Sequence, residues 1–262
     1  MKNINNFLLI CFSIFLVACN PAQKLLNEAD INNSIQLKLP STEGANGTGV
    51  AYNSAKNIYY TAFAGNSSFP LEVFDQTGKF ITKSTMQEDF RGFWYNENKN
   101  ALEGNTFDNS GIYDLLLKDS GLPNGQKKFV VKLFNQPSEQ SCGAYKPETN
   151  EILFYSNGRI YGYNLENGQA TFERKLLYAN GFTSFNTTSF IYTGVKKLEI
   201  ALLNYKESEL IFFNLKNGKY TAKVVLPENY PMSDSFCMSY TNNLLWLYDD
   251  NRRVWKSLKI WK

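Results

Sequence analysis

The 262-residue chain contains no histidine. Without an imidazole it cannot form a Ser–His or Cys–His nucleophile pair, or a zinc site with histidine ligands. Spacings typical of EF-hands or cysteine-rich metal sites are also missing from the sequence. We therefore expect no metal ion and no cofactor.

Long runs of one charge are absent as well. The 27 Lys and Arg residues nearly balance the 24 Asp and Glu residues, which leaves a formal net charge of +3. No basic run exceeds a pair such as Lys127-Lys128. Because nucleic-acid binding requires a concentrated basic surface that neutralises phosphates, we expect no nucleic-acid partner.

Proline is scarce, with 8 residues, whereas aromatic residues make up 15% of the chain. This composition favours a sheet-rich globular protein over a disordered one. A chain of this length can bury a full core as one all-β domain, so nothing requires two domains.

An apolar run lies at the N-terminus, from Phe7 to Ala18, after the positive charge of Lys2. It is too short to cross a hydrocarbon core of about 30 Å as a helix, which indicates a signal peptide rather than an anchor. The run closes with the letters LVAC, Leu16–Cys19.

The LVAC segment resembles the lipobox of bacterial lipoproteins. That resemblance implies a signal peptide at residues 1–18, with Cys19 diacylated on sulfur and acylated on nitrogen, and hence a lipid-anchored protein of the bacterial cell envelope. Asn20 stands where an Asp would signal inner-membrane retention, which favours the outer membrane. Residues 19–33 are then expected to form a polar tether with at most one helical turn. The alternative is an ordinary secretory signal that happens to end in Cys.

Two series of residues recur along the rest of the chain at a spacing in the forties. The first ends in a tyrosine that follows a small residue by three positions: Tyr52, Tyr95, Tyr145, Tyr192 and Tyr240. The second consists of turn glycines: Gly78, Gly125, Gly168 and Gly218. Each period can be divided into four strands, with the glycine in the turn between the third and fourth. Four strands per period of this length are typical of β-propeller blades.

The sequence thus predicts an all-β propeller of five four-stranded blades over residues 34–262. The fifth period lacks a fourth strand, and the segment Ser34–Pro40 precedes the first period where such a strand would stand. We expect this N-terminal strand to complete the last blade and close the ring, which removes an exposed sheet edge.

Two cysteines, Cys142 and Cys237, occupy small positions of the tyrosine series. In an oxidising compartment a disulfide is the usual expectation. However, equivalent inner positions of non-adjacent blades lie about 12–15 Å apart, beyond the limit of about 7 Å for bridged Cα atoms. We therefore expect two buried, free thiols.

Function in such a fold resides in the loops. Those from the fourth strand to the next first strand, and from the second to the third, are expected to meet on one face around the axis. Trp94 is expected to pack between blades. The candidate partner-binding residues on this face are Arg91, Asp89, Glu139, Tyr230 and Asp234.

Two classes of function fit these observations. The first is a non-catalytic, membrane-tethered binding or assembly scaffold with a protein or glycan partner; in anchor and architecture it is similar to the propeller lipoprotein of outer-membrane barrel-assembly machines. An immunity-type lipoprotein that captures a toxin would share these features. The second is a five-bladed enzyme, a glycosidase or a glutaminyl cyclase. A glycosidase needs two facing carboxylates, and the five tyrosine motifs contain no acid. We therefore favour the scaffold and expect no catalytic residue.

Overall fold

The computed structural model describes residues 23–262, except residues 43, 45, 86, 87, 134, 135, 229 and 231. The signal peptide and Cys19 lie outside the described residues. The described chain forms strands and two short 3-10 helices, η1 (Phe107–Asn109) and η2 (Pro147–Thr149). Within that part of the chain, no helix has the length and apolarity to cross a membrane.

Three sheets have four strands each, and in each the strands follow one another in chain order. The first contains β3 (Asn46–Asn53), β4 (Ile58–Ala64), β5 (Pro70–Asp75) and β6 (Phe80–Thr85). The second contains β7 (Phe90–Asn96), β8 (Ala101–Thr106), β9 (Ile112–Leu117) and β10 (Pro123–Val131). The third contains β11 (Ala144–Lys146), β12 (Glu151–Ser156), β13 (Arg159–Asn164) and β14 (Ala170–Lys175).

The remaining strands form one nine-stranded sheet in which two such units are joined. One unit consists of β15 (Phe190–Tyr192), β16 (Ile200–Asn204), β17 (Glu209–Phe213) and β18 (Tyr220–Val225). The other consists of β19 (Met238–Thr241), β20 (Leu244–Asp249) and β21 (Val254–Trp261). Two N-terminal strands, β1 (Leu25–Asp30) and β2 (Gln36–Lys38), both pair with β21.

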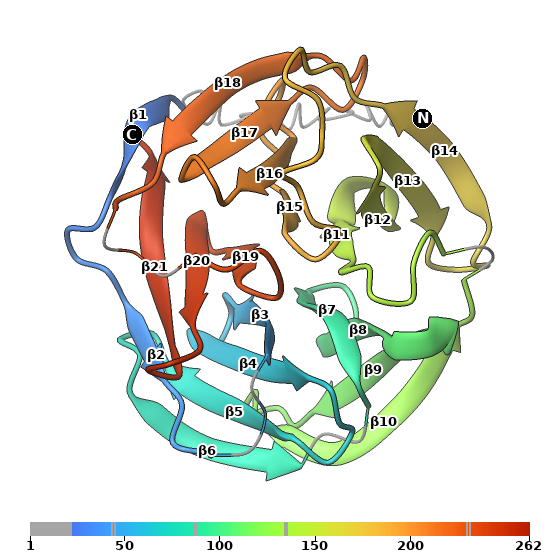
Figure 1. Ribbon diagram of the computed structural model, residues 1–262. Coiled ribbons are helices and arrows are strands. Elements are labelled where there is room, and N and C mark those ends of the chain that lie inside the picture. Colours follow the sequence, from blue (N-terminus) through green and yellow to red (C-terminus); the bar gives the residue numbers. More distant parts are fainter. Residues whose placement is uncertain are drawn as a thin grey trace, which may run out of the picture.

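The units surround a common axis (Figure 1). Their first strands, β3, β7, β11, β15 and β19, contact one another in a closed circle, since each touches the next and β19 touches β3. The later strands of each unit lie progressively farther from the axis, and β6, β10, β14 and β18 run along the circumference (Figure 1). The described residues are therefore arranged as the repeats predict for an all-β propeller.

The N-terminal strand pairs as the sequence predicts. In β2, Leu37 lies opposite Trp255 of β21 in antiparallel register, so residues 36–38 stand where a fourth strand would. The prediction for the preceding segment is wrong. Residues 25–30, expected to belong to a polar tether, form β1, which pairs antiparallel with β21 and parallel with β18. Ala29 is buried there because β1 covers two edges at once.

Turn glycines hold neighbouring units together. Gly168 and Gly218 have φ near +72°, and a Cβ atom on either would lie 2.0 Å from a backbone oxygen of the preceding unit, Lys132 O or Lys175 O. Gly78 approaches Gln36 O of β2 in the same way, which agrees with β2 acting as a fourth strand. Gly125 does not belong to this series. The β9–β10 turn closes at Gly121, whose N–H donates to Lys118 O, while Gly125 lies inside β10.

Each tyrosine of the repeat series lies near the end of a first strand, and in four units its hydroxyl bonds to the turn that follows, whereas the Tyr192 hydroxyl donates to Glu148 in the turn of the preceding unit. In three units it bonds to an asparagine five residues later, at 2.7 to 3.4 Å: Tyr52–Asn57, Tyr95–Asn100 and Tyr145–Asn150. These asparagines have positive φ, which Asn tolerates better than other side chains. The tyrosines therefore lie on one side of the ring, which we call the tyrosine face. It carries the turns at 54–57, 97–100, 147–150, 193–199 and 242–243. The opposite side is the loop face.

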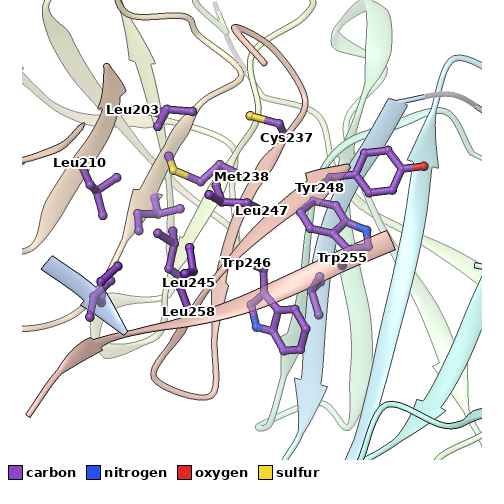
Figure 2. Close-up of a cluster of buried hydrophobic side chains, with 14 of the residues drawn as sticks. Leu203, Leu210, Cys237, Met238, Leu245, Trp246, Leu247, Tyr248, Trp255 and Leu258 are labelled. Atoms are coloured by element: carbon purple, nitrogen blue, oxygen red, sulfur yellow. The ribbon is translucent and has the colours of Figure 1, made fainter. Parts of the chain in front are cut away.

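The apolar core lies between adjacent units. Figure 2 shows its largest cluster, where Met238 and Leu247 of one unit face Leu203 and Leu210 of another, with Trp246 and Trp255 beside them. Trp94 confirms its predicted packing, since its ring stacks on Tyr145 of the next unit with centroids 5.8 Å apart. Each unit buries its surface against two neighbours, so the ring is stabilised as a whole.

Candidate functional site: the axial channel and the loop face

A channel follows the axis and encloses about 200 Å³. All five first strands contribute to its wall, and the described residues that line it carry no formal charge. Its polar groups are hydroxyls, from Thr48, Ser239 and several tyrosines of the repeat series. A wall of this kind offers hydrogen bonds and aromatic faces, but no general acid or base that would be ionised near neutral pH.

The small residues of the repeat series let the first strands approach the axis closely. A Cβ atom on Gly92 would lie 2.3 Å from Gly143 O of the next unit. Cys237 directly precedes β19, and Cys142 stands two residues before β11; both are buried free thiols, as predicted. Burial raises the pKa of the Cys237 thiol to about 11, and it raises the pKa of the Cys142 thiol as well. Both thiols therefore stay protonated and fill space in the packed interior, and neither acts as a nucleophile.

Arg91 lies at the loop-face end of the channel, on β7, and only 4% of its surface is exposed. Its Nε–H donates to Gln140 Oε1 at 2.7 Å, and its terminal nitrogens donate to both carboxylate oxygens of Asp89. The guanidinium carbon lies 4.6 Å from the centre of the Phe107 ring and 5.7 Å from that of Phe236. Arg91 thus ties together loops from three units, and little of it is available to a partner.

Further contacts fix the same loops against one another. Phe236 N–H donates to Thr188 Oγ1 at 3.1 Å, and the Ser189 hydroxyl donates to the backbone oxygen of Asp234, also at 3.1 Å. Phe236 has φ of +48°, a conformation that costs a non-glycine residue roughly 1 kcal/mol or more and persists only where surrounding contacts impose it. The loop face around Arg91 is consequently ordered before any partner binds.

The structure brings four of the five predicted partner-binding residues to this region. Asp89 and Arg91 form an ion pair in which the Arg91 side chain is buried and the Asp89 side chain is partly exposed. Glu139 precedes Gln140 and is exposed, and Asp234 is exposed on the loop that contains Phe236. With exposed Asp108 on η1, the rim around Arg91 carries carboxylates.

Tyr230 is not part of this group. It is half-buried, and its hydroxyl donates to Ser257 O and lies 3.0 Å from the Ser34 hydroxyl. Its ring packs against the core cluster that includes β21. Tyr230 therefore anchors its loop to the N-terminal strands, away from the axis.

A buried polar cluster lies between β7, β8 and β9 that the sequence analysis did not identify. Glu103 accepts hydrogen bonds from Trp94 Nε1 at 2.8 Å and Asn96 Nδ2 at 2.9 Å, and forms an ion pair with Lys99. Asp114 lies directly opposite Glu103 in the β8–β9 register. Burial, together with a hydrogen bond to Glu103 and the negative charge of that residue, raises the pKa of Asp114 to about 7. An aspartate inside the apolar run IYDLLL was the visible signal for this cluster.

Comparison with known proteins identifies the fold and nothing beyond it. No family model matches the chain, and no curated protein does. Many solved structures are similar. Glutaminyl cyclase from Myxococcus xanthus matches over 86% of this chain and 96% of its own, with 6% identity and a TM-score of 0.57. At that identity the match supports the β-propeller fold, and this chain is accordingly a β-propeller protein.

Two further matches have lower TM-scores. BamB from Moraxella catarrhalis gives a TM-score of 0.35 with 12% identity, over 80% of this chain and 57% of its own. A chain of a nidogen/laminin complex gives 0.46 with 10% identity, over 70% and 65%. The chain therefore spans less than two thirds of the length of either protein.

Proposed function

We propose that this chain is a lipid-anchored scaffold of the bacterial cell envelope that binds a partner through the loop face of a five-bladed propeller. The nine-stranded sheet counts as two blades in this proposal, joined by β1. The lipobox-like LVAC segment supports the anchor, and Asn20, at the position where Asp would signal inner-membrane retention, favours the outer membrane.

The observation that carries the scaffold function is the ordering of the loop face around Arg91. Loops from several units are held by partly buried hydrogen bonds, so a partner binds without the entropic cost of ordering them. Exposed Glu139, Asp234 and Asp108 surround this centre. The surface therefore favours a partner with a basic patch, and a protein fits better than a neutral glycan.

A glutaminyl cyclase activity is the second candidate, because a protein of that name shares the fold. The uncharged lining of the channel disfavours it. Assaying the purified chain for pyroglutamate formation from an N-terminal glutaminyl peptide distinguishes the two, since turnover would overturn the scaffold proposal as the primary function.

The anchor is tested by replacing Cys19 with Ser. We expect loss of metabolic lipid labelling and release from the membrane fraction, because acyl chains supply the membrane affinity. Retention of the Cys19→Ser protein after an alkaline wash would contradict the lipobox assignment.

The binding face is tested by a pull-down of the lipidated protein with identification of its partner. The double variant Glu139→Lys/Asp234→Lys should weaken binding about tenfold, since it reverses exposed charge on the loop face. The matched control is Asp119→Lys/Glu166→Lys, in exposed turns outside the loop face. Equal losses from both double variants would remove the loop face as the binding surface.

A further inference from the structure

We infer that the tyrosine face of the propeller lies directly against the membrane and contacts anionic lipid headgroups through lysines. This inference rests on the proposed lipidation of Cys19 and adds an orientation and a lipid partner to it. Two independent observations carry it: the place where the described chain begins, and the distribution of charge between the two faces.

The N-terminal end of the described chain lies at the tyrosine face. Gln23 Nε2 donates to Asn243 Oδ1 in the β19–β20 turn at 3.2 Å, and the backbone oxygen of Lys24 accepts from Lys262 N at 2.8 Å. Leu25 pairs with Trp261, whose indole N–H donates to the hydroxyl of Tyr240. Figure 1 shows β1 beside the C-terminal end of β21.

The segment from Cys19 to this point is short. Even fully extended, the chain from Cys19 to Lys24 reaches roughly 18 Å, at about 3.5 Å per residue. The two faces are separated by about one strand, and the eight residues of β21 span about 26 Å at 3.3 Å per residue. Because this exceeds the reach of the segment, an anchor at Cys19 favours an orientation with the tyrosine face nearer the bilayer than the loop face.

Charge on the two faces differs in sign. Exposed lysines on or beside the tyrosine-face turns are Lys24, Lys56, Lys99, Lys196, Lys197 and Lys259. Fewer carboxylates accompany them: Glu97, Glu148 and Glu199. On the loop face, acids outnumber bases, with Glu88, Asp89, Asp108, Glu139, Glu207, Glu228, Asp234, Asp249 and Asp250 in its loops.

This asymmetry in charge favours an orientation with the tyrosine face against the membrane and the loop face towards solvent. Lysines within a Debye length of an anionic leaflet are attracted to it, whereas the acidic loop face is repelled. The net charge of the whole chain, +3, is too small to reveal this separation. The loop face is thereby presented away from the bilayer, where a partner can reach it.

The test is lysine footprinting of the full, lipidated protein in nanodiscs that contain phosphatidylglycerol. Acetylation rates are measured by mass spectrometry and compared with those of the same protein in a neutral detergent. We expect at least threefold protection of Lys56, Lys196 and Lys197 in nanodiscs, and an unchanged rate at Lys206, in the loop-face turn between β16 and β17. Protection should decrease in phosphatidylcholine nanodiscs and at high salt.

Charge reversal supplies the matched comparison. Lys196→Glu/Lys197→Glu should abolish the protection of Lys56, whereas Lys206→Glu/Arg252→Glu, in exposed turns of the loop face, should leave it intact. Equal labelling of both faces on lipid-labelled protein would overturn the orientation while leaving the anchor in place. Absence of lipid on Cys19 would overturn the proposed anchor and, with it, this inference.

Discussion

Asp114 is a buried residue whose ionisation should make stability depend on pH. Its folded pKa, about 7, lies above the ordinary value of 3.8. The folded state thus holds a proton that the unfolded state releases, and stability falls as pH rises from about 4 to about 7. The cause is local, because Asp114 is buried opposite Glu103 and cannot ionise without placing two carboxylates side by side.

Asp114→Asn should remove this dependence. The amide imitates the protonated carboxyl and can donate to Glu103, so the variant should be more stable than the parent at pH 8. We expect the parent to lose about 2–3 kcal/mol more than the variant between pH 5 and pH 8. Urea unfolding at several pH values measures the difference. Asp119→Asn, in an exposed turn of the same sheet, should behave like the parent; parallel profiles for parent and Asp114→Asn would refute the assignment.

Arg91 is a predicted partner-binding residue, but its burial makes it a structural residue as well. Arg91→Ala should cost about 2–3 kcal/mol, since it removes a partly buried ion pair and the contacts with Phe107 and Phe236. Arg252→Ala is the control, because 76% of the Arg252 side chain is exposed. Its cost should be below about 0.5 kcal/mol. A thermal unfolding midpoint equal for both variants would show that Arg91 does not hold the loops. Whether Arg91 also contributes to partner binding stays a prediction.

At the scale of elements, the turn glycines join one unit to the next. Gly168→Ala should cost about 3 kcal/mol, because the new Cβ would collide with Lys132 O in addition to the strain of positive φ. Gly125 also has positive φ, yet has no atom near its Cβ position. Gly125→Ala should therefore cost only about 1 kcal/mol, and the difference in unfolding free energy isolates the contact between units. Similar losses at both positions would mean that this contact contributes nothing.

Strand β1 should stabilise the domain, contrary to the expectation of a tether. Ala29→Asp places a charge in the core cluster where β1 meets β18 and β21, and should cost about 2–3 kcal/mol. Asn27→Asp, on the exposed side of the same strand, should change the unfolding free energy by less than about 0.5 kcal/mol. Denaturant midpoints compare the two. If Ala29→Asp were as harmless as its control, β1 would be only loosely attached.

Strand order and turn positions were predictable because the signals for them are local. Apolar runs such as ILFY and LLWLY, each followed by turn residues, identify strands β12 and β20 directly. The segment LLNEAD carries no such alternation, and it becomes a strand only through partners supplied by β18 and β21. The DSGLPNG segment contains two glycines suited to a turn, and the choice of Gly121 depends on the strand register.

The site was predictable only as a region. Loop connectivity places Asp89, Arg91, Glu139 and Asp234 at one end of the axis, which follows from the repeat alone. The burial of Arg91 depends on Gln140, Phe107 and Phe236, which are distant in sequence. Tyr230 turns away because Ser34 and Ser257 provide its hydrogen bonds. Pairings of this kind have no signature in a single sequence.

At the scale of the molecule, the reactivity of the two buried thiols shows whether the ring of strands is closed or open. Cys142 lines the channel just before β11, Cys237 directly precedes β19, and both thiols are buried. In a chain with Ser in place of Cys11 and Cys19, neither should react with a thiol reagent until the ring opens, so both should be labelled at the rate of global unfolding. An added Asn157→Cys, in an exposed turn, should react at once. Rapid labelling of one native cysteine alone would indicate that its blade opens independently.

The pairing of β1 and β2 with β21 also sets an order of events during synthesis. Partners such as Gln23 and Asn243 are 220 residues apart in the chain. Strands β1 and β2 therefore cannot pair with β21 until β21 has been synthesised. Closing so long a loop is entropically unfavourable, and contacts of this separation slow folding. Until residues 254–261 emerge, the nascent chain carries unpaired strand edges at both ends, which are open to aggregation. Ring closure is thus expected to be the final and slowest step of folding, and the stage at which the chain most needs a chaperone.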